Sequence, residues 1–233
     1  KSTRQAIRTA RNKGIQIQFG GTELLDDFSA LMKKTENRKN IHLRSKDYYQ
    51  KLLDTYPEHS YITLSSIDLK ARLEDLQAQL TKTLKEAEKF TEKTKPGKIE
   101  NNQQEQKRLQ EEIDFLQDKI SQGAAVVPLS GTLVLEYGKT SENIYAGMDE
   151  EYRRYQPAII TWYETAKHAF ERGADWQNMG GIENDLKGGL YSFKSKFNPT
   201  IEEFAGEFNL PTNPLYHLSN LAYTIRKKLR SKH

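Results

Sequence analysis

The chain has 233 residues and a net charge of +4, and 29% of its residues are charged while 36% are hydrophobic. It contains no cysteine, which excludes disulfide bonds and thiolate zinc sites. No apolar run approaches the roughly 18 residues of a membrane-spanning helix. Because the chain starts at Lys1 without a methionine and with a helical pattern, we expect it to be a fragment of a longer protein or a processed product.

The first 65 residues hold an excess of positive charge, with 12 Lys or Arg against 7 Asp or Glu. Such a balance suits phosphate-bearing partners, although it is also typical of a solvated surface. The expected elements are a helix at 3–13, a strand at 15–19, helices at 22–32 and 45–55, and a strand at 60–64.

Residues 66–123 predict a long helical hairpin. Leucines recur with 4-3-4 spacing on the outward segment, and an equivalent apolar series follows on the return segment. The two series are Leu69, Leu73, Leu76 and Leu80, then Leu109, Ile113, Leu116 and Ile120. This spacing is typical of an antiparallel coiled coil, and the polar stretch 91–101 supplies the turn. We expect an arm inserted into a domain formed by 1–65 and 124–233; a dimerisation or purely structural arm is the alternative.

The segment after the arm predicts the rest of a mixed sheet. The expected elements are strands at 124–129, 132–137, 143–147, 174–179 and 203–208, a helix at 158–172, and a helix or loop at 190–197. A last helix begins near Asn213, carries an apolar stripe and ends in the basic segment 226–232. An unpartnered stripe would favour self-association. The fold class is therefore α/β (α+β), a mixed sheet with flanking helices.

Sequence motifs for metal or nucleotide chemistry are missing. The five histidines form no HxxxH or HExxH pair, so no metal site is expected. There is also no GxSxG, GxxxxGK[ST] or GxGxxG, so neither a nucleophilic serine nor a bound nucleotide cofactor is indicated.

Two residue groups could bind a substrate. Arg44 and Tyr48 lie four apart in the expected short helix, which places a cation beside a phenol and suits a phosphate. Residues 191–197 interleave aromatic side chains with lysines, a pattern typical of contacts to single-stranded nucleic acid ends. Each pattern also fits an ordinary surface, with a half-buried aromatic side chain beside solvated basic ones.

The order of these stretches resembles the Fem family of peptidoglycan-branching aminoacyltransferases, in particular the FemA- and MurM-like members with a helical arm. The stretches that carry the resemblance are 1–15, 43–49, the arm, 144–147 and 189–197. It implies an acetyltransferase-like (GNAT-like) fold, of which this chain would be the second domain, without its N-terminal partner domain. It also implies transfer of an amino acid from aminoacyl-tRNA to the stem-peptide amine of a UDP-linked or lipid-linked muropeptide.

The resemblance also implies roles for individual residues. Arg44, Tyr48 and Tyr145 would contact the muropeptide, and Phe193 and Lys194 would meet the aminoacylated end of the tRNA. Lys194 would be the catalytic residue, because its ammonium could stabilise the oxyanion of acyl transfer. No cofactor is implied, and the reaction would take place in the cytoplasm, at the inner face of the membrane if the acceptor is lipid-linked.

Two other functions stay open. An acetyl-CoA-dependent N-acetyltransferase would need a (Q/R)xxGxG/A loop, which the sequence lacks. A non-enzymatic coiled-coil or tRNA-binding module would not explain why the chain has both candidate groups, Arg44 with Tyr48 and residues 191–197.

Overall fold

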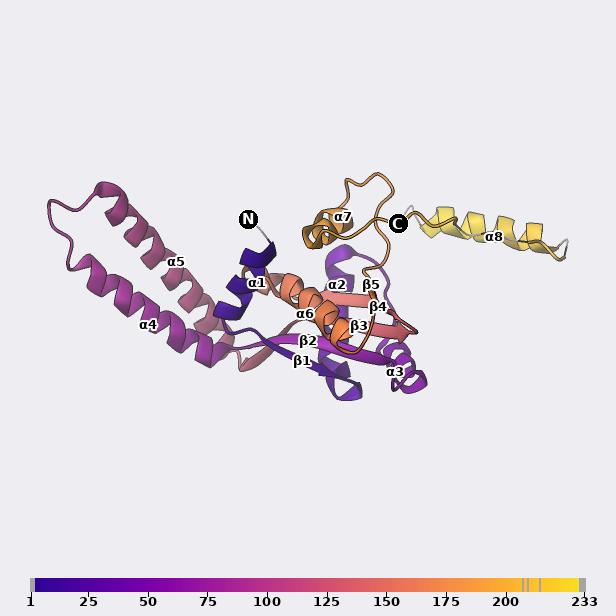
Figure 1. The fold of residues 1–233 in the computed structure, drawn as a ribbon, viewed down its shortest axis with the longest axis horizontal. Coiled ribbons are helices and arrows are strands. Elements are labelled where there is room, and N and C mark those ends of the chain that lie inside the picture. Colours follow the sequence, from indigo (N-terminus) through magenta and orange to yellow (C-terminus); the bar gives the residue numbers. More distant parts are fainter. Residues whose placement is uncertain (1–2, 207, 209, 214, 231–233) are drawn as a thin grey trace. The chain divides into compact units, whose positions relative to one another are not determined.

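A five-stranded mixed sheet forms the centre of the fold (Figure 1), in a computed structural model that describes residues 3–206, 208, 210–213 and 215–230. The strands are β1 (Gln16–Gly20), β2 (Ser60–Asp68), β3 (Val126–Tyr137), β4 (Thr140–Met148) and β5 (Trp176–Asn178). They lie in the order β1-β2-β3-β4-β5, and all pairs are antiparallel except the parallel pair β4–β5. The predicted fold class, a mixed sheet with flanking helices and an inserted antiparallel hairpin, is confirmed.

The remaining elements are helical. They are α1 (Thr3–Asn12), η1 (Thr22–Leu24), α2 (Leu25–Lys39), α3 (Lys46–Thr55), α4 (Leu69–Ala87), α5 (Pro96–Ser121), η2 (Glu150–Tyr155), α6 (Pro157–Glu171), α7 (Gly189–Lys194), η3 (Ser195–Phe197) and α8 (Leu215–Arg230).

Helices cover both faces of the sheet. On β3, Leu133 packs in a cluster with residues of α2 and α3, whereas the neighbouring Thr132 bonds through its hydroxyl to Thr165 of α6 at 2.9 Å. Because successive strand residues point to opposite faces, α2 and α3 lie on one face and α6 on the other. Central strand β2 is accordingly buried along eight of its nine residues, which explains why its sequence lacks a clean polar alternation.

The expected break between strands at 128–131 is wrong, because β3 runs unbroken through it. A register shift in β2 between Ser65 and Ser66 accommodates Pro128, which cannot donate to the ladder. Gly131 is needed for packing and not for a turn: a Cβ there would lie 3.0 Å from the ring of Phe28.

Three further elements differ from the sequence-based expectation, and the open choice of helix or loop at 190–197 is decided. Strand β2 continues to Asp68, whose carboxylate accepts from the backbone N–H groups of Lys70 and Ala71 and so caps α4. The expected strand at 174–179 is shortened to β5, and the segment 190–197 is helical as α7 and η3. The expected strand at 203–208 is wrong, since the described residues between 199 and 213 contain no strand.

The chain divides into two compact units, Lys1–Asn198 and Pro199–His233. In the second unit, α8 carries the apolar stripe predicted at Leu215, Leu218, Ala222, Ile225 and Leu229, of which the side chain of Leu229 lies outside the described part. Leu215, Leu218 and Ile225 are 51–67% exposed. Part of the basic segment 226–232 lies outside the described residues, and self-association through this helix stays a prediction.

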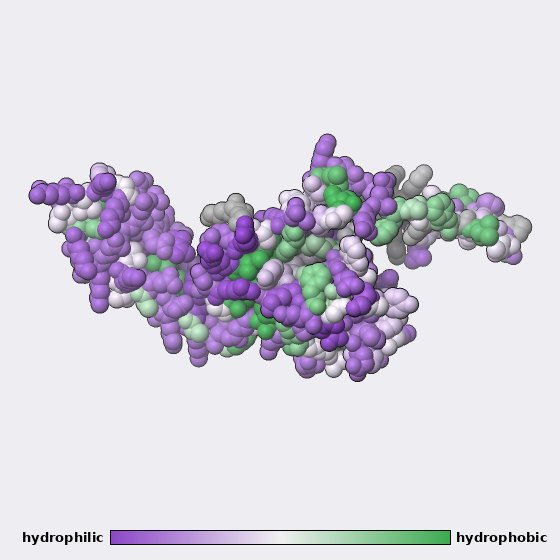
Figure 2. Space-filling view, in the orientation of Figure 1, coloured by the Kyte–Doolittle hydropathy of each residue, from purple (hydrophilic) through white to green (hydrophobic). Residues whose placement is uncertain are grey.

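The hairpin of α4 and α5 is fastened to the body by a shared hydrophobic core. Its leucine seam is buried near the base, where Leu69, Leu76 and Leu116 are fully enclosed. The same cluster includes Leu129 of β3 and Ile160 of α6. The base of the hairpin therefore belongs to the core, while its outer surface is mostly hydrophilic (Figure 2).

A buried charge network lies at this base. The carboxylate of Glu112 in α5 accepts from Nε and Nη2 of Arg72 in α4 at 3.1 and 2.9 Å. It also accepts from Nζ of Lys13 at 3.3 Å and from Nη1 of the less buried Arg108 at 3.4 Å. Burial alone would raise the pKa of Glu112, but the charges of Lys13 and Arg72 outweigh burial and lower it.

We predict that Glu112→Gln lowers the free energy of unfolding by about 3 kcal/mol, because it leaves buried cations without their carboxylate. The matched control is Glu111→Gln, which removes the exposed carboxylate next to it and should change stability by about 0.5 kcal/mol or less. Urea unfolding measured by circular dichroism at neutral pH checks both variants.

The pH dependence tests the same network. Since the folded pKa of Glu112 is lowered from 4.5, its stabilisation is present above the unfolded-state pKa and is lost as pH falls through the folded pKa. The stability gap between wild type and Glu112→Gln should therefore shrink in acid. A gap that stays constant down to full protonation would contradict this explanation.

Candidate functional site

A loop between β5 and α7 is folded around the carboxylate of Glu183. The backbone N–H groups of Leu190 and Tyr191, at the start of α7, each donate to Glu183 at 3.1 Å. These bonds and one from its own N–H lower the pKa of Glu183. The carboxylate lies so close to Gly188 that a Cβ there would come within 2.0 Å of its Cδ, so a larger residue would displace Glu183 from this position. Glu183 therefore fixes where α7 begins.

Lys194 closes the same loop at the other end of α7. Its side chain is buried, with 7% of the residue exposed, and its Nζ donates to the carbonyl oxygen of Gly181 at 2.7 Å. Nζ also lies 5.7 Å from the ring centroid of Trp162 in α6. Burial lowers the pKa of Lys194. An ammonium held this way, against an aromatic wall, is a fixed donor in a poorly solvated place.

Aromatic rings surround this lysine. Phe193 packs edge-on against Trp162 with centroids 5.2 Å apart and against Phe197 with centroids 5.7 Å apart. The predicted pair Phe193 and Lys194 thus shares one neighbour, Trp162, which the sequence analysis missed because α6 is distant in the chain. The amphipathic pattern of 191–197 is explained mainly by this packing, while Lys196 stays exposed.

The second candidate group gathers on β4 and around α3. The guanidinium carbon of Arg44 lies 5.0 Å from the ring centroid of Tyr48, and the Tyr48 ring lies edge-on to Tyr145 with centroids 6.3 Å apart. Tyr49, fully buried, packs on Tyr145 at 5.0 Å. Burial raises the pKa of Tyr145. The structure therefore brings together all three predicted muropeptide contacts and adds Tyr49.

One detail of the prediction is wrong: Arg44 is not part of the short helix. Helix α3 begins at Lys46 with Ser45 before it, so the four-residue spacing to Tyr48 is not a helical one. Arg44 and Tyr48 still meet, because the extended Ser45 leads the chain back over the first turn of α3. Arg44 is exposed and has no carboxylate partner among the described residues, while its side chain also hydrogen-bonds to Tyr145.

Strand β4 links the two groups. Tyr145 pairs with Leu133 and Asn143 pairs with Val134, so Ile144 between them is an unpaired bulge residue. Asn143 lies beside the lysine loop: a Cβ at Gly180 would be 3.8 Å from its carbonyl oxygen and 3.6 Å from Nζ of Lys194. Tyr145 follows only two residues later, roughly 7 Å along the strand. No hydrogen bond, ion pair or ring contact joins the two groups within the described part of the chain.

The combined site has a fixed buried ammonium, an aromatic wall and an exposed guanidinium, all within reach of one strand. This arrangement suits a substrate with a carbonyl and a separate anionic group. No group of three or more potential metal ligands occurs among the described residues. None of the described helices is both long and apolar enough to cross a bilayer.

Comparison with known sequences identifies the family. The model of the FemAB family matches residues 1–224. The chain belongs to the FemAB family. This membership confirms the resemblance inferred from the motifs and their order.

Named relatives of this FemAB chain include the Lipid II:glycine glycyltransferases of three staphylococci. The Staphylococcus epidermidis protein is 29% identical, and those of Staphylococcus haemolyticus and Staphylococcus aureus are 26% identical. Each match covers 94% of this chain but only 55–56% of the relative. The chain therefore spans about half the length of these relatives.

A solved structure supports the fold. The crystal structure of FemX matches with a TM-score of 0.58 at 23% identity, over 83% of this chain and 51% of FemX. This likeness confirms the acetyltransferase-like fold class.

We predict that Glu183→Gln loosens the start of α7. Amide exchange at Leu190 and Tyr191 should accelerate roughly 10-fold or more, because charge-assisted hydrogen bonds are lost. The matched control is Asp185→Asn, which removes a carboxylate that accepts from Lys187 N–H in the same loop but does not touch α7. Hydrogen exchange measured by NMR checks both variants; equal exchange rates in the two would show that Glu183 does not fix this helix.

Proposed function

We propose that this FemAB chain carries half of an aminoacyltransferase that moves an amino acid from aminoacyl-tRNA to the stem-peptide amine of a peptidoglycan precursor. The observation that carries the proposal is the buried ammonium of Lys194, held against Trp162 and Phe193 in a FemAB chain. The glycyltransferase names of the relatives support transfer of an amino acid, and their naming of lipid II supports a lipid-linked acceptor.

The reaction needs charge stabilisation and no covalent intermediate. The acceptor amine attacks the ester carbonyl of the aminoacyl-tRNA, and negative charge develops on the carbonyl oxygen. A donor from Lys194 stabilises that oxygen, the C–O bond of the ester breaks, and the proton lost by the amine is transferred to the tRNA oxygen, which leaves as a hydroxyl. Lys194 is the catalytic residue in this scheme, and Phe193 beside it packs near the aminoacylated end of the tRNA.

The acceptor would be held by the group on β4. Arg44 offers an exposed guanidinium without a carboxylate partner among the described residues, supported from one side by the ring of Tyr48. A planar guanidinium in this state suits a phosphate oxygen pair. Tyr145 and Tyr48 form the adjoining wall, which would face the sugar or the phosphates.

In the proposed organisation, residues 1–65 and 124–233 form the domain that carries this site, with 66–123 inserted as the arm. A further domain, corresponding to the half of the relatives that this chain does not match, would complete it. Transfer would occur in the cytoplasm, at the inner membrane face for a lipid-linked acceptor.

The alternatives fit less well. An acetyl-CoA-dependent N-acetyltransferase would share the fold, but the chain lacks the pyrophosphate loop, and its named relatives are glycyltransferases. A non-enzymatic module would not require a lysine to be desolvated against Trp162, which costs stability.

We predict that Lys194→Met lowers kcat by about 100- to 1000-fold, because the lost donor acts mainly in the transition state. The matched control is Lys196→Met, an exposed lysine two residues away, which should leave kcat within about 3-fold of wild type. The assay measures transfer from charged tRNA to the lipid- or nucleotide-linked acceptor with the full-length protein. Near-wild-type turnover in Lys194→Met would end the catalytic assignment.

We predict that Arg44→Met instead raises KM for the acceptor by roughly 10- to 100-fold, as expected for a charged hydrogen bond worth about 1.5 to 3 kcal/mol. Arg153→Met, at an exposed arginine of η2, serves as the control and should keep the acceptor KM. An unchanged acceptor KM in Arg44→Met would contradict the anchoring role while leaving that of Lys194 untouched.

A further inference from the structure

The tip of the hairpin is positively charged, although the arm as a whole is close to neutral. Residues 82–98 hold six lysines, three glutamates and no arginine. The remainder of α5, residues 99–121, holds three basic and six acidic residues. The arm is therefore close to neutral only because a positive tip is balanced by a negative body.

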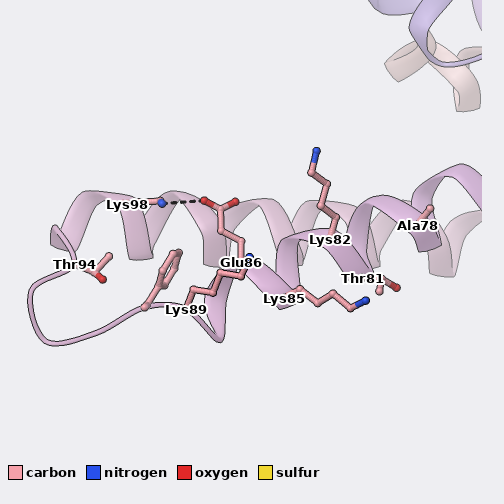
Figure 3. Close-up of a pocket in the computed structure, with 9 residues that line it drawn as sticks. Ala78, Thr81, Lys82, Lys85, Glu86, Lys89, Thr94 and Lys98 are labelled. Atoms are coloured by element: carbon pink, nitrogen blue, oxygen red, sulfur yellow. Dashed lines mark ion pairs between the residues drawn. The ribbon is translucent and has the colours of Figure 1, made fainter.

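The packing between the two helices becomes polar toward this tip. The leucine seam ends at Leu80, and at the next seam position the backbone carbonyl of Thr83 accepts from Nδ2 of Asn102 at 3.0 Å. An open cavity of about 730 Å³ lies here, lined by the last turns of α4, the connecting loop and Lys98 of α5. Its lining includes Lys82, Lys85, Lys89 and Lys98, together with Phe90 and Thr94 (Figure 3).

Three of these lysines are not neutralised. Lys98 pairs with Glu86 at 3.0 Å and lies 5.3 Å from the ring centroid of Phe90. Lys82, Lys85 and Lys89 have no ion-pair partner among the described residues, and Figure 3 shows Lys82 and Lys85 extending away from α4. Charges more than about 10 Å apart are screened at physiological salt, so the acidic body of α5 does not cancel this tip.

We propose that the tip of the hairpin, residues 82–98, binds the phosphate headgroups of an anionic lipid surface. Flexible lysines without any arginine suit diffuse attraction to such a surface, each adding roughly fivefold in affinity. Leu84, 44% exposed, provides an apolar side chain beside them. Nucleic acid recognition would favour arginine forks and aromatic rings open for base stacking, whereas Phe90 is half-buried under Lys98.

This contact goes beyond the proposed transfer, since it assigns a partner to a part of the chain that touches neither candidate group. It would hold the protein at a membrane surface independently of substrate, so it can be measured without turnover.

The test is co-sedimentation of the full-length protein with phosphatidylcholine vesicles that contain about 30% phosphatidylglycerol. The tip variant is Lys82→Gln, Lys85→Gln and Lys89→Gln combined, and we expect its affinity to fall on the order of 100-fold. The matched control combines Lys51→Gln, Lys70→Gln and Lys107→Gln, three exposed lysines away from the tip, and removes the same net charge. It should bind within about threefold of wild type.

Thermal melting confirms that both variants are folded, as expected for side chains without ion-pair partners. If both variants lost the same affinity for the vesicles, the effect would come from net charge alone and the proposal would be wrong. Unchanged binding by the tip variant would also overturn the proposal, and so would equal binding to pure phosphatidylcholine vesicles. Displacement by millimolar inorganic phosphate at constant ionic strength would assign a soluble phosphate site instead. If the tip variant lost affinity for tRNA but kept its affinity for vesicles, the tip would be a nucleic acid contact and the lipid assignment would be wrong.

Discussion

The buried ion pair between Arg72 and Glu112 determines how the hairpin can be attached. Both side chains are only 3–4% exposed, so each charge has been removed from water and depends on the other, while Lys13 and Arg108 also bind the carboxylate of Glu112. Arg72 comes from α4, Glu112 from α5 and Lys13 from the residue after α1, so the complete network forms only when all three segments meet at one point. A coiled-coil seam alone would tolerate sliding by a turn, whereas a slipped register here would leave a buried charge unpaired. The network therefore specifies the register that the leucines only favour.

Strand β4 has the same organising role for the candidate site. One side chain, Tyr145, belongs to the aromatic group over α3, and the backbone two residues earlier lies beside the lysine loop. The bulge at Ile144 allows β4 to contact both groups within three residues, because it interrupts the pairing of β4 with β3. The two groups are held differently: ring packing orders Tyr48, Tyr49 and Tyr145, whereas the hydrogen bonds of Glu183 and Lys194 order the loop. A change in one group should therefore be transmitted to the other only through β4.

The sequence predicts well those parts of the fold that depend on local periodicity. The hairpin, α6 and the strand at 60–64 follow directly from apolar spacing. It fails where a distant partner decides the outcome: β2 pairs along both halves of 126–137 and so keeps Pro128 and Gly131 inside one strand. The candidate residues Arg44, Tyr145 and Lys194 were found through family-like motifs, but their supports were not. Trp162 reaches Lys194 across 32 residues of chain and Asn143 bonds to Gln177 across 34, while Glu183 binds the start of α7, and no local pattern marks these residues. Charge summed over the whole arm similarly hid the positive tip.

The geometry of Lys194 bears on how the proposed reaction could proceed without rearrangement. An ammonium has three donors, and the bond to Gly181 uses one of them. The ring of Trp162 faces the same nitrogen but accepts no strong hydrogen bond, so further donors remain for a substrate oxygen. A carbonyl that arrives there would gain a donor while the bond to Gly181 keeps the lysine in place. The burial that lowers the lysine pKa also removes competing water, which strengthens the interaction with a developing negative charge. The free-energy cost of desolvating Lys194 is thus part of the folding of the protein, where the bond to the Gly181 carbonyl offsets some of it. It does not add to the barrier of the transfer step.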